Sequence, residues 1–435
     1  MTRDRGILRL WGDLVDPHTG IVAEVKQLLV DDDEPRFVHY LSRAAHTEAF
    51  GYLDNFGNNG GVGMDVDTAI AKALGEAVER YCAAMFDYEV FQWTSYAELG
   101  VPATPPDTFA LYSDEQYAKP GFTWRPFTAQ STVAWTPGRS LVSGAEILIP
   151  AAFVYVPFHY VQRRRGDTPI AQPISTGLAC GTSVEDAARS ALCEVIERDA
   201  FTLTWQTGAS RRRVTSGDLP SSVQDAVDRF ETAGVAVHLM DITRDVGCPT
   251  ILSVAEGFAP SSPAVAVAAA THPDAASAAR KSLEELAHTR KFAAQVMDYL
   301  PPVPIDIPGG HPSVDNQRAH LRFYCPQEAK QAAAFLWAAE DECSLDDIPV
   351  PRDLSLTALV EQVAATGEDV IAVDLTTPDI ADLGLSVVRV VVPGFHPLHM
   401  GHANRALGGR RFADAMGEIP RWHGFPDNPY PHPFP

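Results

Sequence analysis

Long apolar runs are missing from this sequence, as is any secretory signal. No stretch of eighteen or more apolar residues occurs, so no helix is expected to span a membrane. Residues 1–11 carry three arginines and one acid, without an apolar region or a small-residue cleavage site, which is not the pattern of a signal peptide. We therefore expect a cytoplasmic protein.

Cysteine pairs and basic residues are also scarce. The six cysteines are scattered, with no C-x-x-C pair and no metal-like spacing, which favours reduced thiols over a zinc site. Lys and Arg number 34 against 56 Asp and Glu, a formal net charge of -22 at pH 7. This charge argues against nucleic acid or an anionic membrane as the main partner. The Walker sequence G-x-x-x-x-G-K-[ST] is absent, which excludes a P-loop nucleotide site.

What the sequence does contain is typical of a globular α/β protein. Hydrophobic residues make up 46% and charged residues 21%, as in ordinary folded chains. Apolar residues recur at helical spacing in residues 65–86, 183–204, 274–297 and 354–365. Strand-like runs lie between them, at residues 147–156, 235–240, 250–254, 264–269, 370–375 and 387–392. Roughly the first forty residues indicate strands and turns, with a hairpin at the turn residues 16–20. Strands that alternate with helices predict the α/β class.

One short pattern occurs twice in the predicted helices. Residues 73–80, ALGEAVER, reappear as residues 191–198, ALCEVIER, and a weaker echo, SLEELAHTR, follows at residues 282–290. Three related helices imply internal pseudo-repetition. The two glutamates of each full copy are three residues apart and therefore lie on one helix face. They are Glu76 with Glu79, and Glu194 with Glu197.

Two such carboxylate pairs that face each other could bind magnesium. Ionised groups beside an apolar stripe are costly unless they are paired or bound to metal, and Mg²⁺ takes carboxylate oxygens while keeping sites for water and phosphate. Glycine-rich stretches precede both helices, at residues 57–63 and 175–182. As loops, they would let backbone N–H groups approach an anion. The alternative is a solvated helix face, because Ala, Leu, Glu and Arg are common helix formers.

These motifs resemble those of the YcaO family, and the similarity extends from about residue 15 to the C-terminus. The family's glycine and E-x-x-E-R blocks stand here as residues 61–63 with 73–80, and as residues 175–182 with 194–198. The resemblance implies a YcaO-type fold with pseudo-repeated strand and helix units. It also implies that ATP and Mg²⁺ bind between the helices without a Walker loop.

Site residues follow from this resemblance, position by position. The implied magnesium ligands are Glu76, Glu79, Glu194 and Glu197. The residues implied around ATP are Ser175, Thr182, Asp186, Arg80, Arg198 and Arg290. The chain departs from the usual family pattern at Val62, Lys72, Thr176, Thr182, Asp186 and His288.

The last eight residues, NPYPHPFP, have proline at every second position. Proline fixes φ and lacks a donor, so this tail is expected to be a stiff, extended rod. Composition alone favours a disordered end or an SH3-type ligand. The tail also resembles that of azoline-forming YcaO proteins, which implies that it reaches the active site and that the terminal carboxylate of Pro435 acts as a catalytic base.

Three histidines near the tail, His396, His399 and His402, could be mistaken for a zinc site. Pro397 and Gly401 between them indicate a loop. We expect local hydrogen bonding there, since a zinc site needs ligands that converge tetrahedrally.

The resemblance implies an ATP-dependent cyclodehydratase of ribosomal peptide natural product biosynthesis. Cys, Ser or Thr of a precursor peptide would become thiazoline or oxazoline, as in thiopeptide-like antibiotics, after ATP phosphorylates the backbone amide oxygen. Two alternatives stay open. A thioamide-forming YcaO enzyme would use the same ATP site, and the departures at Val62 and Thr182 suggest a noncatalytic scaffold subunit.

Domain limits and partners complete the expectations. Residues 1–40 are expected to form an N-terminal strand or hairpin region, residues 41–420 the YcaO catalytic domain, and residues 421–435 the proline-rich tail. The length leaves no room for the ubiquitin-activating-enzyme-like domain that captures leader peptides in fused relatives. A separate leader-binding protein of that kind is therefore an expected partner, besides the precursor peptide, a flavin-dependent dehydrogenase and a second copy in a homodimer.

Overall fold

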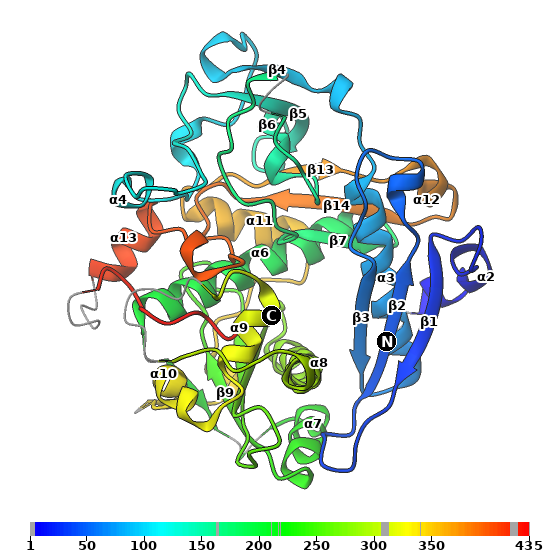
Figure 1. The fold of residues 1–435 in the computed structure, drawn as a ribbon, viewed down its shortest axis with the longest axis vertical. Coiled ribbons are helices and arrows are strands. Elements are labelled where there is room, and N and C mark those ends of the chain that lie inside the picture. The colour runs from blue at the N-terminus through cyan, green and yellow to red at the C-terminus, as the bar shows by residue number, and fades with distance from the viewer. Residues whose placement is uncertain are drawn as a thin grey trace.

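The computed structural model describes residues 5–161, 165–209, 211–215, 217, 219–305, 313–339, 341–417 and 425–434. Within these ranges, three sheets pack against three long helices (Figure 1). The predicted α/β class is confirmed. No helix in the described ranges is both long and apolar enough to cross a bilayer.

The sheets are built from fourteen strands. Their orders are β1-β2-β3, then β11-β10-β9-β8-β12, then β4-β5-β13-β14-β7 with β6 paired to β5. Among these strands, every pairing is antiparallel except that of β8 with β12. The bounds are β1 Val22–Leu28, β2 Val38–Ala44, β3 Asn58–Gly63, β4 Gln92–Ser95, β5 Thr132–Ser140, β6 Glu146–Pro150, β7 Leu178–Gly181, β8 Arg212–Val214, β9 Ala236–Asp241, β10 Thr250–Glu256, β11 Val265–Thr271, β12 Glu342–Cys343, β13 Ile371–Asp374 and β14 Ser386–Val391.

The three long helices each begin directly after a strand. Helix α3 (Val66–Ala84) follows β3, α6 (Val184–Thr207) follows β7, and α8 (Ala275–Tyr299) follows β11. Asp65, Ser183 and Asp274 cap their first turns by accepting a backbone N–H three residues on. The pseudo-repetition predicted from the sequence is therefore confirmed as three strand–helix units. The other helices are α1 Arg5–Leu8, α2 Trp11–Leu14, α4 Asp114–Tyr117, α7 Ser221–Thr232, α9 Gln317–Phe323, α10 Lys330–Ala333, α11 Leu356–Ala365, α12 Pro378–Asp382 and α13 Arg410–Gly417.

The glycine-rich stretches, expected as loops, supply strands instead. Residues 58–63 form β3 and residues 178–181 form β7. A Cβ at Gly61 would lie 2.0 Å from the carbonyl oxygen of Ala69, and one at Gly181 would lie 2.7 Å from the backbone nitrogen of Ala187. The glycines are therefore needed because each helix turns back directly onto its own strand.

The N-terminal prediction is wrong in part. Two short helices, α1 and α2, precede the first strand, and the turn at residues 16–20 connects α2 to β1. Asp16 fixes this turn by accepting backbone hydrogen bonds from His18 and Thr19 at 2.8 and 2.9 Å. The hairpin of this region is β1 with β2. The predicted strand at residues 147–156 also ends early, since β6 stops at Pro150 and a 3₁₀ turn follows.

The three units close into a ring. Helix α3 contacts β7 of the next unit, α6 contacts β11, and α8 contacts β3 of the first unit. Figure 1 shows α3 beside the blue strands, the green α6 across the middle of the molecule and α8 nearly end-on. One face of each helix is thereby directed toward a shared interior. Strand β2 spans residue 40, and the domain limits at residues 40 and 420 stay predictions.

Candidate active site

A cavity of about 1250 Å³ lies between α3, α6 and α8. A second space of about 290 Å³ adjoins it and shares Glu194, Arg198 and Lys281. Eight of the eleven predicted site residues line the larger cavity: Glu76, Glu79, Arg80, Ser175, Thr182, Asp186, Glu194 and Arg198. Glu197 lines the smaller one. The catalytic prediction, Pro435, lies outside the described residues.

Arg290 is the predicted residue that lines neither cavity. It is 5% exposed and donates from Nη1 to the carbonyl oxygen of Pro263 at 3.0 Å. It follows the cavity-lining His288 by two positions on α8, and two positions turn a helix by about 200°. Its side chain is therefore directed to the opposite face, where it holds the loop that contains Pro263.

The first glutamate of each pair is tied to its own unit. Glu76 accepts from the backbone N–H of Gly60 at 2.7 Å, and Glu194 from that of Gly177 at 3.1 Å. The arginine four residues later is paired with the same glutamate in both helices, at 3.2 Å for Arg80 and 3.3 Å for the equivalent arginine of α6. The two copies of the motif therefore share one local geometry.

The second glutamate of each pair is tied to the next unit. Glu79 accepts from the backbone N–H of Cys180 in β7 at 2.8 Å, and Glu197 from that of Thr271 in β11 at 3.2 Å. His288 takes the equivalent position on α8 and packs against β3, where a Cβ added to the glycine at position 60 would lie 2.4 Å from the imidazole ring. The same position of all three helices thus forms the junctions of the ring.

The second glutamate of each pair has a perturbed pKa in this interior. Burial raises the pKa of Glu79 and of Glu197 to about 8, and neighbouring glutamates add to the shift, while Arg80 and Arg198 oppose it. Carboxylates in such surroundings fit a hard divalent cation, because the ion would stabilise their charged form. No three His, Cys, Asp or Glu side chains in the described part of the chain already converge on one metal position. The fit therefore rests on the donor chemistry of the four glutamates.

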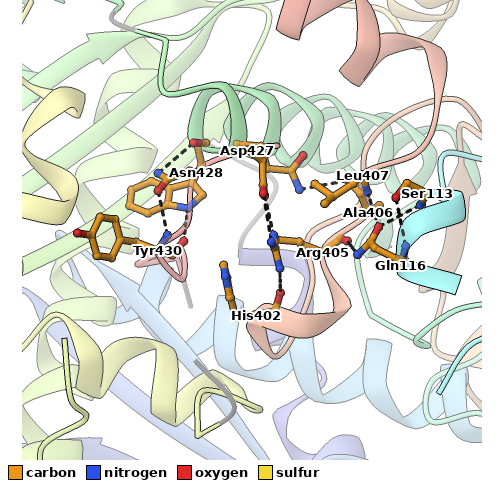
Figure 2. Close-up of polar contacts among 11 residues, drawn as sticks. Ser113, Gln116, His402, Arg405, Ala406, Leu407, Asp427, Asn428 and Tyr430 are labelled. Carbon is orange, nitrogen blue, oxygen red and sulfur yellow. Dashed lines mark hydrogen bonds and ion pairs between the residues drawn. The ribbon is translucent and has the colours of Figure 1, made fainter. Parts of the chain in front are cut away.

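The described part of the proline-rich tail is packed inside the protein. Figure 2 shows its start, where buried Asp427 receives two hydrogen bonds from Arg405, at 2.6 and 3.1 Å. Asn428 donates its backbone N–H to Gln206 on α6 at 2.9 Å, and the indole of Trp205 donates to the Tyr430 carbonyl at 3.1 Å. Residues 427–434 are therefore packed in the protein and do not form the free end that composition alone favours.

The tail then reaches the smaller cavity. The hydroxyl of Tyr324 donates to the carbonyl of Pro431 at 2.6 Å. Phe434 lines the smaller cavity together with Glu197, and the guanidinium of Arg198 lies 4.5 Å from its ring centroid. The last described residue is thus in contact with the arginine of the second motif.

The histidines near the tail are buried, and the expected local hydrogen bonding is not found at His396, neither of whose ring nitrogens has a hydrogen-bond partner among the described residues. The His432 ring bonds through Nε2 to the carbonyl of His399 at 2.8 Å and stacks on His320 at 4.1 Å. Burial lowers the pKa of His320 to about 4 and that of His432 well below its usual value. These rings are neutral near pH 7 and seat the tail by packing.

Sequence reasoning missed the inward face of α8. Lys72 of α3 reaches across to Glu284 and Glu285 at 2.9 and 3.1 Å, and Lys281 lines both cavities. The signal was present in the third echo of the motif. Aligned on the A-L or S-L pair, Lys72, Ser190 and Lys281 occupy one position, as do Glu76, Glu194 and Glu285.

Comparisons with known proteins agree with this architecture. A family model described as YcaO cyclodehydratase, ATP- and Mg²⁺-binding, matches residues 60–396. An uncharacterized protein of Methanothermobacter thermautotrophicus is 30% identical over 347 residues, which cover 77% of this chain and 80% of that protein.

Three solved structures share the fold. A heterocyclase in complex with substrate and cofactor gives a TM-score of 0.78 at 22% identity and covers 99% of this chain. The YcaO protein of Methanopyrus kandleri, bound with AMPPCP and Mg²⁺, gives 0.65 at 21% identity, over 93% of this chain and 94% of that one. The E. coli microcin synthetase McbBCD complex with pro-MccB17 bound gives 0.62 at 14% identity, over 97% and 99%.

The chain spans 57% of the length of the heterocyclase. The likeness to the solved structures concerns the fold, whereas the family model covers more than three quarters of the sequence. This chain belongs to the YcaO cyclodehydratase family of ATP-dependent enzymes.

Proposed function

We propose that this chain is an ATP-dependent cyclodehydratase that converts Cys, Ser or Thr residues of a ribosomal precursor peptide to thiazolines or oxazolines. The observation that carries the proposal is the pair of equivalent helices, α3 and α6, whose four glutamates line adjoining cavities. The family's description as ATP- and Mg²⁺-binding supports the same reading.

The reaction joins ring closure to phosphoryl transfer. The side-chain sulfur or oxygen of the peptide adds to the preceding carbonyl carbon and loses its proton. The carbonyl oxygen takes the terminal phosphoryl group of ATP, and ADP leaves. Loss of the amide proton then forms the C=N bond as inorganic phosphate departs with that oxygen, so the peptide loses the elements of one water.

The chain's own residues would position and stabilise the phosphates. Glu76, Glu79, Glu194 and Glu197 would hold Mg²⁺, which neutralises phosphate charge when bound. The Nη1 group of Arg80 is buried and has no hydrogen-bond partner among the described residues, so it is available as a phosphate donor.

The base in ring formation is proposed to be the terminal carboxylate of Pro435. The position of Phe434 beside Arg198 supports this assignment. Two residues added after Pro435 should abolish heterocycle formation and leave the melting temperature unchanged. Unchanged ring formation by that variant would exclude the role.

A separate leader-binding protein and the precursor peptide are the proposed partners. The microcin synthetase was solved as a multi-protein complex with pro-MccB17 bound, which supports this arrangement. We expect the purified chain alone to modify little peptide. Robust turnover without a partner would contradict that expectation.

The central test combines mass spectrometry with calorimetry. With partner, precursor peptide, ATP and Mg²⁺, the product should lose the mass of one water per ring, whereas exchange of one oxygen for sulfur would identify a thioamide-forming enzyme. Glu194→Gln should abolish Mg²⁺–ATP binding, while Glu185→Gln, an exposed carboxylate on the same helix, should not. Absence of nucleotide binding by the unmodified chain would favour the scaffold.

A further inference from the structure

The third helix of the ring contributes a cation that the two E-x-x-E-R motifs do not contain. Lys72, Ser190 and Lys281 stand at the same position of α3, α6 and α8, four residues before the first acid of each motif. All three line both cavities. Pseudo-repetition therefore directs this position into the interior in every unit.

The two lysines at this position differ in their neighbours. Lys72 is neutralised by Glu284 and Glu285, at 2.9 and 3.1 Å, and Glu284 is also paired with Arg280. These acids are therefore already paired, and Lys281 has no hydrogen bond or ion pair with any residue that the structure describes. Its ammonium is half-buried and uncompensated.

Such a group is stabilised by an anion. Burial lowers the pKa of Lys281, and the nearby charge of Lys72 lowers it further. Burial lowers the pKa of His272 in the same cavity to about 4, so His272 is neutral and contributes no charge there. Of the carboxylates that line the smaller cavity, Glu285 is paired with Lys72, and Glu194 and Glu197 are the proposed ligands of Mg²⁺. A partner for Lys281 must therefore come from a ligand that enters this space.

We propose that Lys281 binds the terminal phosphate of ATP and holds the transferred phosphoryl group beside the magnesium carboxylates. This proposal rests on the proposed function, because it takes ATP as the ligand of the cavity. It assigns to α8 a contact with the nucleotide in place of the one expected at Arg290, whose side chain is directed to Pro263.

The test compares nucleotides that differ only in their phosphates. Calorimetry with Mg²⁺ should show that Lys281→Ala weakens ATP binding about 10- to 100-fold, the range expected for one charge-assisted phosphate contact, while AMP binding stays unchanged. Lys281→Arg should restore most of the ATP affinity, because it restores the charge. Arg280→Ala is the matched control, since this neighbouring cation on α8 lines neither cavity.

Stability separates ligand binding from a structural role. Removal of an uncompensated buried charge should leave the melting temperature of the nucleotide-free protein unchanged or raise it. Lys281→Gln serves as a second variant that keeps most of the side-chain volume. Equal losses of ATP and AMP affinity, or no loss of either, would overturn the assignment of Lys281. The proposed function would stand in that case, as long as the unmodified chain binds ATP. Absence of ATP binding by the unmodified chain would overturn both.

Discussion

The packed position of the tail depends on the buried ion pair between Arg405 and Asp427, and the free-energy cost of breaking this pair can be predicted. Asp427 is fully buried, Arg405 is 9% exposed, and two hydrogen bonds join them. Asp427→Asn keeps the volume but leaves the guanidinium without a counter-charge. Breaking a buried pair at one partner costs about 3–5 kcal/mol. If the tail opens locally, its open population should rise roughly 10²- to 5 × 10³-fold.

Hydrogen exchange measures that population directly. The backbone N–H of Asn428 donates to Gln206 at 2.9 Å, so it exchanges only when the tail is released. Its rate should rise by the factor given above in Asp427→Asn. The surface pair of Arg352 with Glu361 is the control, since both side chains are more than half exposed and such a pair contributes about 0–1 kcal/mol. Glu361→Gln should leave the exchange rate unchanged.

A double replacement tests the reasoning behind the magnitude. Burial raises the pKa of Asp427 despite the opposing charge of Arg405, which indicates that desolvation outweighs the attraction. Asp427→Leu combined with Arg405→Met should therefore return exchange toward the original rate, because an apolar pair of similar size often replaces a buried ion pair without loss. The account is refuted if Asp427→Asn changes the rate less than tenfold, or if the double variant exchanges as fast as the single one.

Three other predictions concern packing and pH. Gly61→Ala should destabilise the fold by at least about 3 kcal/mol, because its methyl would lie 2.0 Å from a backbone oxygen of α3. Gly75→Ala, with open space around it, should stabilise α3 by about 0.5–1 kcal/mol, and thermal unfolding measures both changes. Tyr324→Phe should weaken the seat of the tail by about 1 kcal/mol in the same exchange assay, because it removes the 2.6 Å hydrogen bond to Pro431. Since burial lowers the pKa of His432 in the folded protein, the released tail binds the proton more readily, so acidification through the usual pKa of 6.5 should increase tail release.

Each of these predictions has a defined contrary outcome. Equal melting temperatures for the two glycine variants would show that the strand–helix approach is not tight. Unchanged exchange in the tyrosine variant would remove its hydroxyl from the anchors of the tail. The pH effect should disappear in His432→Gln to the extent that this ring causes it. Other groups also act on the buried histidine rings. The pKa of His432 responds to His320 and Arg198, and that of its neighbour His399 responds to His320, His402 and Arg405. A pH profile that is identical in the variant would assign the effect to those groups.

Much of the fold could be predicted because helix caps and periodicity are local signals. Asp65 and Ser183, residue types that favour the helix N-terminus, cap α3 and α6, and the strands predicted after residue 230 agree with the structure within two residues. The glycine stretches were misassigned because their requirement is not local. Gly61 and Gly181 are needed for the approach of a helix that begins after them.

The candidate site could be predicted on α3 and α6, where the motif is repeated in full, but not on α8, where residues 282–290 match it only weakly. Glu76 and Glu194 have matching partners in space, as their matching sequence suggests. The inward direction of Lys281 depends on how α8 closes the ring, which no single helix pattern reveals. Arg290 was expected at the nucleotide from resemblance alone, and its position on α8 turns it away.

The bonds from Glu79 to Cys180 and from Glu197 to Thr271 have a consequence for how the molecule responds to its ligands. Each of these two cavity-lining carboxylates also joins two neighbouring units. Ligand binding in the cavities and the contacts between neighbouring units are then thermodynamically linked. If ligand binding strengthens these two hydrogen bonds, a change that strengthens them raises ligand affinity by the same factor. The amide protons of Cys180 and Thr271 accordingly act as built-in reporters of whether the interior is filled.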